Sequence, residues 1–171
     1  AGALYGPAQV SAPVETLSAA TGIGSSDTAL QVLTPALTAT NTTGLMNVHN
    51  LLLAATTVTL TNGTGAIAYR QAGGPLTLGS VQTTEGEIAV SADQGELKAN
   101  QVNAGGDVTL NVPAGGSIDL ESVSASGGDI TVNSQGTLVL EQNVTTHGEN
   151  LNFNTALSLP QDTTITTNGG A

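Results

Sequence analysis

The chain has 171 residues and a formal net charge of −11, with 2 Lys or Arg, 13 Asp or Glu, no Cys, no Trp and 2% aromatic residues. Two cations cannot neutralise a row of phosphates, and the aromatic residues on which single-stranded nucleic acids stack are scarce, so we expect no nucleic-acid binding. The absence of Cys excludes disulfide frameworks, Cys-based zinc sites and thiol catalysis.

The composition indicates a folded chain of unusual make-up. Charged residues are only 9% and Gly contributes 22 residues, whereas disordered chains combine low hydrophobicity with high charge. No charged-then-apolar leader opens the sequence, and the longest apolar run, Leu51–Ala55, is far shorter than the roughly 20 residues that span a bilayer. We therefore expect a mature, processed or excised part of a soluble protein, without a membrane span.

Short alternating segments follow a less periodic start. Residues 1–25, which contain Pro7 and Pro13, are predicted to be an entry or capping segment. Between residues 26 and 75, alternation of apolar and polar residues predicts short strands. These strands are Ala29–Val32, Leu37–Ala39, Leu45–Val48, Leu51–Leu53, Val58–Leu60 and Ile67–Tyr69, with turns at Asn41–Gly44 and Asn62–Gly65.

A period of about 20–21 residues is clear from Leu76 onward. Each unit contains three short alternating segments separated by turns, and no stretch sustains a helical apolar pattern. The equivalent apolar positions are Leu76, Leu97, Ile118, Leu138 and Leu157 for the first segment, Val81, Val102, Val123 and Val144 for the second, and Ile88, Val108, Ile130 and Leu151 for the third.

Such a unit cannot bury its apolar face alone, so successive units must stack and share a core. The sequence therefore predicts an all-β fold, a parallel β-solenoid with three short strands per rung, spanning residues 26–171 and clearest over 76–168. Rungs about 4.8 Å apart would place the equivalent apolar positions above one another as three core ladders.

The repeats resemble those of a known family. The runs Gly22–Ser26, Ala29–Leu30, Leu37–Gly44, Leu76–Val81 and Gly105–Leu110 resemble the β-strand repeats of filamentous-haemagglutinin-like proteins, which are large bacterial surface or secreted proteins. The resemblance covers roughly residues 20–168. It implies a right-handed parallel β-helix, export to the cell surface or medium, and adhesive or scaffolding work.

One column of acidic residues is the candidate metal site. Glu87, Asp107 and Asp129 precede the third strand of successive rungs, and Glu149 and Asn150 follow at the next. Like charges one rung apart repel, and Ca²⁺ would relieve that repulsion. The alternative, solvated turns that keep the rod soluble, is favoured because the glycine-rich Ca²⁺ nonapeptide is absent. Glu121 and Glu141 form a similar, weaker column.

Catalysis is the next class considered, because parallel β-helices also host polysaccharide lyases and hydrolases. These enzymes need paired carboxylates, or a carboxylate and a base, converging on one groove. Arg70 and Lys98 lie on different rungs with no His beside them in the repeat pattern, and His49 and His147 are interpreted as surface or turn residues. We expect no enzyme and no obligatory cofactor.

Threonine-rich runs raise a further hypothesis. Thr56–Thr61 and Thr163–Thr167 resemble the hydroxyl arrays of ice- or mineral-binding faces. A regular array needs the same Thr-x-Thr pattern on consecutive rungs, and the clear repeats show Thr only sporadically. The β-propensity of Thr is the simpler explanation.

The prediction for function is therefore a non-enzymatic structural or adhesive module of a bacterial cell-surface or secreted protein. Its partners would be flanking repeats or further copies of itself, which meet it through the ends of the solenoid, and surface glycans, because solenoid ends carry unpaired strands. The alternative is a polysaccharide-binding or polysaccharide-lyase β-helix.

Overall fold

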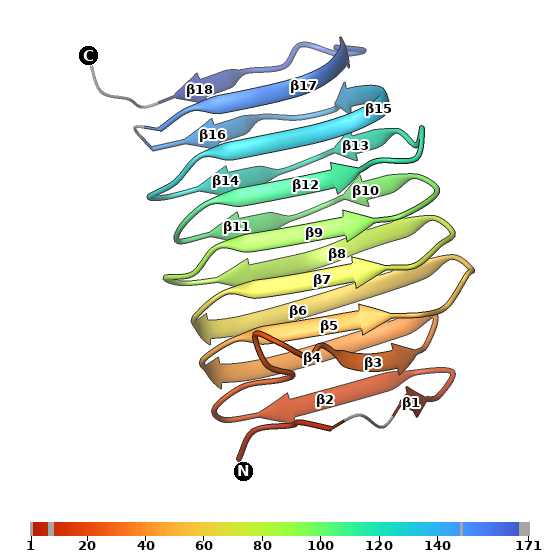
Figure 1. Cartoon of the computed structure of the whole chain (residues 1–171). Helices are drawn as coiled ribbons and strands as arrows, with labels where there is room; N and C mark the ends of the chain where they lie inside the picture. Colours follow the sequence, from red (N-terminus) through yellow and green to blue (C-terminus); the bar gives the residue numbers. More distant parts are fainter. Residues whose placement is uncertain (1, 7–8, 148, 168–171) are drawn as a thin grey trace.

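The chain is a single stack of parallel strands wound into a right-handed solenoid of about seven turns. The computed structural model describes residues 2–6, 9–147 and 149–167, and no helix occurs in them. Figure 1 shows the handedness: as the chain rises, the nearer strands run to the right and the farther strands return to the left. Outside the described residues lie Ala1, Pro7 and Ala8 of the predicted entry segment, Gly148 of the last predicted turn, and residues 168–171.

One side of the solenoid, here called the front sheet, faces the viewer in Figure 1. Its strands pair in parallel with the strand one rung above and one rung below. They are β1 (Val10–Ser11), β3 (Leu30–Leu33), β5 (Met46–Asn50), β7 (Ile67–Gln71), β9 (Ile88–Ala92), β12 (Val108–Val112), and the first parts of β15 (Ile130–Leu140) and β17 (Leu151–Ser158).

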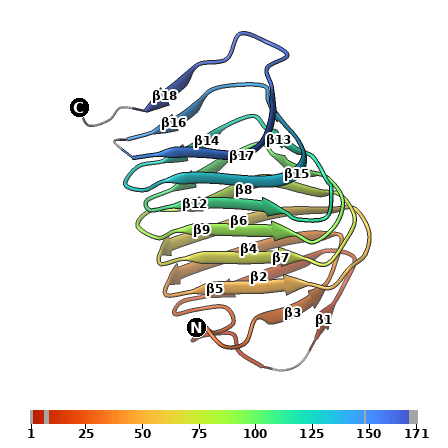
Figure 2. The same cartoon turned by 45° about the horizontal axis from the view of Figure 1, so that its top comes forward.

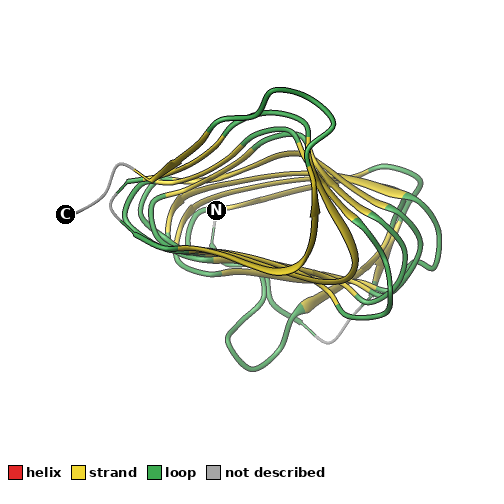
Figure 3. Cartoon of the chain, turned by 90° about the horizontal axis from the view of Figure 1, so that it is seen from above, coloured by secondary structure: helices red, strands yellow, loops and turns green. Residues whose placement is uncertain are grey.

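The opposite side, here called the back sheet, is built from long strands below and pairs of short strands above. The long strands are β2 (Glu15–Ala19), β4 (Ala36–Thr43), β6 (Thr56–Thr64) and β8 (Leu76–Thr83). The short ones are β10 (Leu97–Ala99), β11 (Val102–Ala104), β13 (Ile118–Leu120), β14 (Val123–Ala125), β16 (Val144–Thr146) and β18 (Ile165–Thr167), together with the last parts of β15 and β17. The tilted view in Figure 2 shows the stack continuing from end to end, and Figure 3 shows its cross-section.

Three strands per rung occur only in the upper half of the solenoid. There β10 and β11 both pair with β8, which is a single strand carrying both Leu76 and Val81. Below that level the first and second predicted segments are fused into one long strand. The register of β6 against β8 shifts between Val58 and Thr59, where β8 accommodates an extra residue at Gly79.

The predicted core ladders lie in register. Leu76 pairs with Leu97, Val81 with Val102, and the higher members follow in the same order. In the third ladder, Ile88 pairs with Val108 and onward to Leu151. Nearly all these side chains are fully buried, whereas Leu157 at the top is 43% exposed. Small and branched aliphatic side chains thus fill a narrow interior without any Trp.

The first rung lies within the predicted entry segment. β2 pairs with β4 over five consecutive residues, and buried Ile23 bridges Leu4 below and Met46 above. The described residues of this segment, 2–6 and 9–25, therefore supply the lowest turn of the stack and extend its core.

Buried amide side chains line two corners of the solenoid, which the sequence analysis did not predict. Asn41 and Asn62 stack one rung apart, with Asn41 Nδ2 3.1 Å from Asn62 Oδ1. The Asn62 amide also donates to the turn carbonyls of Gly44 and Gly65, at 2.8 and 3.0 Å. Sharp turns leave carbonyls without ladder partners, and these amides satisfy them.

The turn after each Asn requires Gly. Gly65 has a φ of +115°, and a Cβ at this position would collide with the carbonyl of Gly44 one rung below. A side chain would therefore separate the stacked turns that the amides hold together.

Candidate functional site

The predicted acidic column lies at one edge of the stack, where two of its carboxylates accept hydrogen bonds from the backbone of the next rung. Asp107 Oδ1 accepts a hydrogen bond from the Asp129 N–H at 2.9 Å, and Asp129 Oδ1 accepts from the Asn150 N–H at 2.8 Å and its Nδ2 at 3.2 Å. Glu87 and Glu149 are exposed at the same edge. Charge-assisted hydrogen bonds of this kind tie each rung to the next.

These carboxylates do not converge on one point. Within residues 2–6, 9–147 and 149–167, no group of three or more His, Asp or Glu side chains is arranged to hold a metal ion. The hydrogen bonds of Asp107 and Asp129 account for these two residues as turn-capping groups. Ca²⁺ binding here stays the less favoured of the two hypotheses.

The weaker acidic column is bridged by a cation. Lys98 Nζ lies 2.7 Å from Glu121, 3.6 Å from Asp119 and 3.9 Å from Glu141. The hydrogen bond to Glu121, with the charges of the three carboxylates, raises the pKa of Lys98. The Lys98 ammonium group thus lies close to carboxylates from two higher rungs and reduces the repulsion between these like charges.

A histidine lies beside Arg70, so the expectation that neither cation has a His as its neighbour was wrong for Arg70. His49 on β5 and Arg70 on β7 are direct pairing partners, and Arg70 forms a two-pronged ion pair with Asp93 at 2.7–3.0 Å. His49 is half-buried on a strand, whereas His147 lies exposed in a turn as predicted. The sequence contained a signal for the pairing of His49 with Arg70, because these two residues are separated by the 21-residue period.

His49 has an unusual environment. Its Nε2 is buried without a hydrogen-bond partner in the described part of the chain. Burial lowers the pKa of His49, and the neighbouring Arg70 charge lowers it further, against a smaller opposing effect of Asp93. Both effects favour the neutral imidazole beside Arg70.

This arrangement predicts a pH dependence of stability. Because the folded pKa of His49 lies below 6.5, the unfolded chain binds more protons than the folded one as the pH falls below 6.5. The free energy of unfolding should therefore decrease over that range, and His49→Gln should remove this part of the decrease. Urea titrations of both proteins between pH 7.5 and pH 5 measure it; parallel curves would show that His49 does not contribute.

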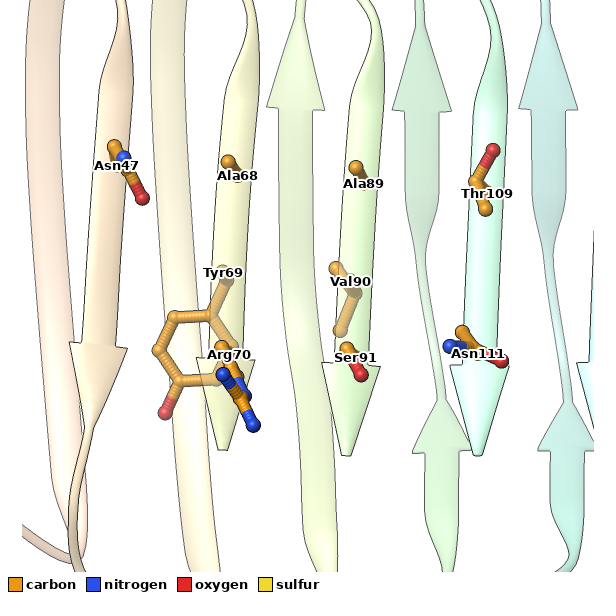
Figure 4. A pocket seen from close by; sticks show the side chains of 9 residues that line it. All are labelled: Asn47, Ala68, Tyr69, Arg70, Ala89, Val90, Ser91, Thr109 and Asn111. Carbon is orange, nitrogen blue, oxygen red and sulfur yellow. The ribbon is translucent and has the colours of Figure 1, made fainter. Parts of the chain in front are cut away.

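A shallow groove lies on the outer face of the front sheet (Figure 4). It has a volume of about 300 Å³, and the small side chains of Ala68 and Ala89 form its floor. The other lining residues are Asn47, Tyr69, Arg70, Val90, Ser91, Thr109 and Asn111, of which Tyr69 and Val90 have their side chains in the core.

The rim of this groove is polar and its floor is apolar. Amide, hydroxyl and guanidinium groups surround its apolar floor, and none of its lining residues is a carboxylic acid. Glycosidic cleavage needs an acid and a base on either side of the bond. The lining residue Arg70 forms an ion pair with Asp93, which is not itself a lining residue.

No helix long and apolar enough to cross a membrane occurs among the described residues. No protein-family model, no curated protein and no solved structure matches this chain.

Proposed function

We propose that this chain is a non-enzymatic structural or adhesive β-solenoid module of a bacterial cell-surface or secreted protein. The observation that supports it most directly is the continuous in-register core, which runs through every rung from β2 to β16. Both cations are engaged in ion pairs that join rungs. The resemblance of the repeats to filamentous-haemagglutinin-like proteins supports the proposed location at the bacterial cell surface or in the medium.

The upper end of the rod supports end-to-end association. Leu157, Leu159 and Ile165 are 43%, 52% and 42% exposed, and β17 and β18 have no strand above them among the described residues. At the other end, Tyr5 and Val14 are exposed. An apolar edge strand with free N–H and C=O groups is a template for a further strand, which flanking repeats or a second copy would supply.

Stacking predicts concentration-dependent filaments. Electron microscopy and analytical ultracentrifugation of the purified chain should show assemblies that lengthen with concentration. Leu157→Lys combined with Ile165→Lys should shift the protein to monomer, because each lysine places a charge at the joint. Leu53→Lys is the matched control, since Leu53 is 75% exposed on a side loop and should leave assembly unchanged. A strictly monomeric wild-type protein at high concentration contradicts stacking.

The alternative, a polysaccharide-binding or lyase-type β-helix, is favoured by one observation, the groove over Ala68 and Ala89 with Arg70 at its side. The same preparation should be incubated with acidic polysaccharides. Binding without cleavage is compatible with adhesion, whereas unsaturated sugar products would overturn the non-enzymatic proposal.

A further inference from the structure

The outer face of the lower back sheet is a continuous array of hydroxyl groups. Every second residue of β2, β4, β6 and β8 points outward, and most of these residues are threonine. We call this the threonine face, which consists of Thr16, Ser18, Thr38, Thr40, Thr57, Thr59, Thr61, Thr77 and Ser80.

The strand register aligns these residues across consecutive rungs. One column runs Thr16, Thr38, Thr59 and Ser80. A second column contains Ser18, Thr40 and Thr61, and Thr57 pairs with Thr77 in a third. Thr is therefore regular in these lower rungs, although it is sporadic in the clear repeats on which the sequence-based expectation rested. That expectation was based on the units from Leu76 onward, whereas the array lies mostly before them.

The array has two regular repeats. Rungs lie about 4.8 Å apart, and alternate residues of one strand are about 6.6 Å apart, so the hydroxyls of β2, β4 and β6 form a nearly rectangular lattice. The extra residue at Gly79 interrupts this lattice in β8, between Thr77 and Ser80. The branched Thr side chain is restricted at χ1, which holds each hydroxyl and methyl group in a fixed direction. Two repeats of this size are close to those between oxygen atoms on the faces of crystalline ice.

Several hydroxyls of this face are available to a ligand, whereas that of Thr40 donates to the Leu17 carbonyl at 3.5 Å and that of Ser80 donates to Gln101 Oε1 at 3.3 Å. The hydroxyls of Thr38, Thr59 and Thr61 make no side-chain hydrogen bond to any described residue. Thr38 and Thr61 are exposed and Thr59 is partly exposed. Their hydrogen-bonding capacity is therefore directed to the solvent side.

The face also carries no formal charge, although the chain has a net charge of −11. The first charged residues in its columns are Lys98 and Asp119, on the rungs above β8. A charged side chain keeps its own tightly bound water, which cannot join a neutral lattice of water molecules. A face of hydroxyl and methyl groups is neutral, as is the water lattice.

We propose that the threonine face binds ice. The ligand is a neutral, flat and periodic water lattice, which requires neither a pocket nor an aromatic platform, and neither is present at this face. Thr hydroxyls continue the hydrogen bonding of the lattice, and the methyl groups order the water between the columns. This inference does not depend on the stacking proposed above.

Partition into growing ice tests the proposal. The wild-type protein should be enriched in a slowly grown ice hemisphere and should inhibit recrystallisation, whereas a protein with no ice affinity is excluded into the liquid. Thr38→Lys combined with Thr59→Lys places two charges at the centre of the array and should abolish both effects.

A matched control is available on the opposite side of the rod. Thr109 and Thr131 are also outward threonines paired across adjacent rungs, so Thr109→Lys with Thr131→Lys introduces the same change on the front sheet. This variant should retain ice partition. Circular dichroism confirms that each protein is folded before it is scored. Exclusion of the folded wild-type protein from ice overturns the proposal, and so does equal loss in both double variants.

Discussion

Replacing Asn62 by alanine is expected to lower the free energy of unfolding by about 2–4 kcal/mol. The Asn62 amide is buried between two rungs, where it accepts from Asn41 and donates to the carbonyls of Gly44, Gly65 and Ala66. Alanine removes these bonds and leaves the carbonyls without a partner in a corner where Asn62 is only 2% exposed. Urea denaturation followed by circular dichroism measures the loss.

Asn103→Ala is the control for this prediction. Asn103 points outward from β11 and its side chain makes no hydrogen bond within the described residues, so its replacement should change stability by less than about 0.5 kcal/mol. Equal effects at the two positions would mean that the buried amide pair does not hold the rungs together.

Leu97→Ala is expected to cost about 2–5 kcal/mol, because it empties the centre of a ladder whose neighbours cannot collapse. Leu97 is completely buried between Leu76 and Ile118. In the same ladder, Leu157 is 43% exposed at the top of the stack. Leu157→Ala should therefore cost less than about 1 kcal/mol, since little apolar surface is lost from the interior.

This pair of variants also reports on association. Both changes remove the same atoms, so the difference between them measures only how well each site is covered. Denaturation should be repeated over a range of protein concentrations. If the loss of stability caused by Leu157→Ala rises to that of Leu97→Ala at high protein concentration, the upper rung is covered by another copy. If the two variants lose the same free energy of unfolding at every concentration, the upper end is not open.

Much of the upper half of the solenoid could be predicted from the sequence. The spacing of Leu76, Leu97 and Ile118 is a near-constant 21 residues, and the structure pairs them in that order. Apolar residues alternate on these strands because one side faces a core and the other faces water, which makes the pattern visible without coordinates. The all-β, parallel architecture follows from this regularity.

The lower half was harder to predict, because its strands are longer and its turns less uniform. The pairs Thr16–Thr38 and Thr59–Ser80 are 22 and 21 residues apart, and Gly79 inserts an extra residue between neighbouring columns. The same period would nevertheless have linked His49 to Arg70 and Asn41 to Asn62, had it been applied upstream.

The sequence by itself determined that this chain folds as stacked rungs around a narrow aliphatic core, because period-2 alternation and a repeat of about 21 residues leave few other ways to bury its apolar side chains. Only the tertiary structure decided which outward residues become neighbours. The partners lie a full turn apart in the chain, and turn length sets the register between them. That register assembled the threonine face, placed His49 against Arg70, and gave Lys98 its three carboxylates.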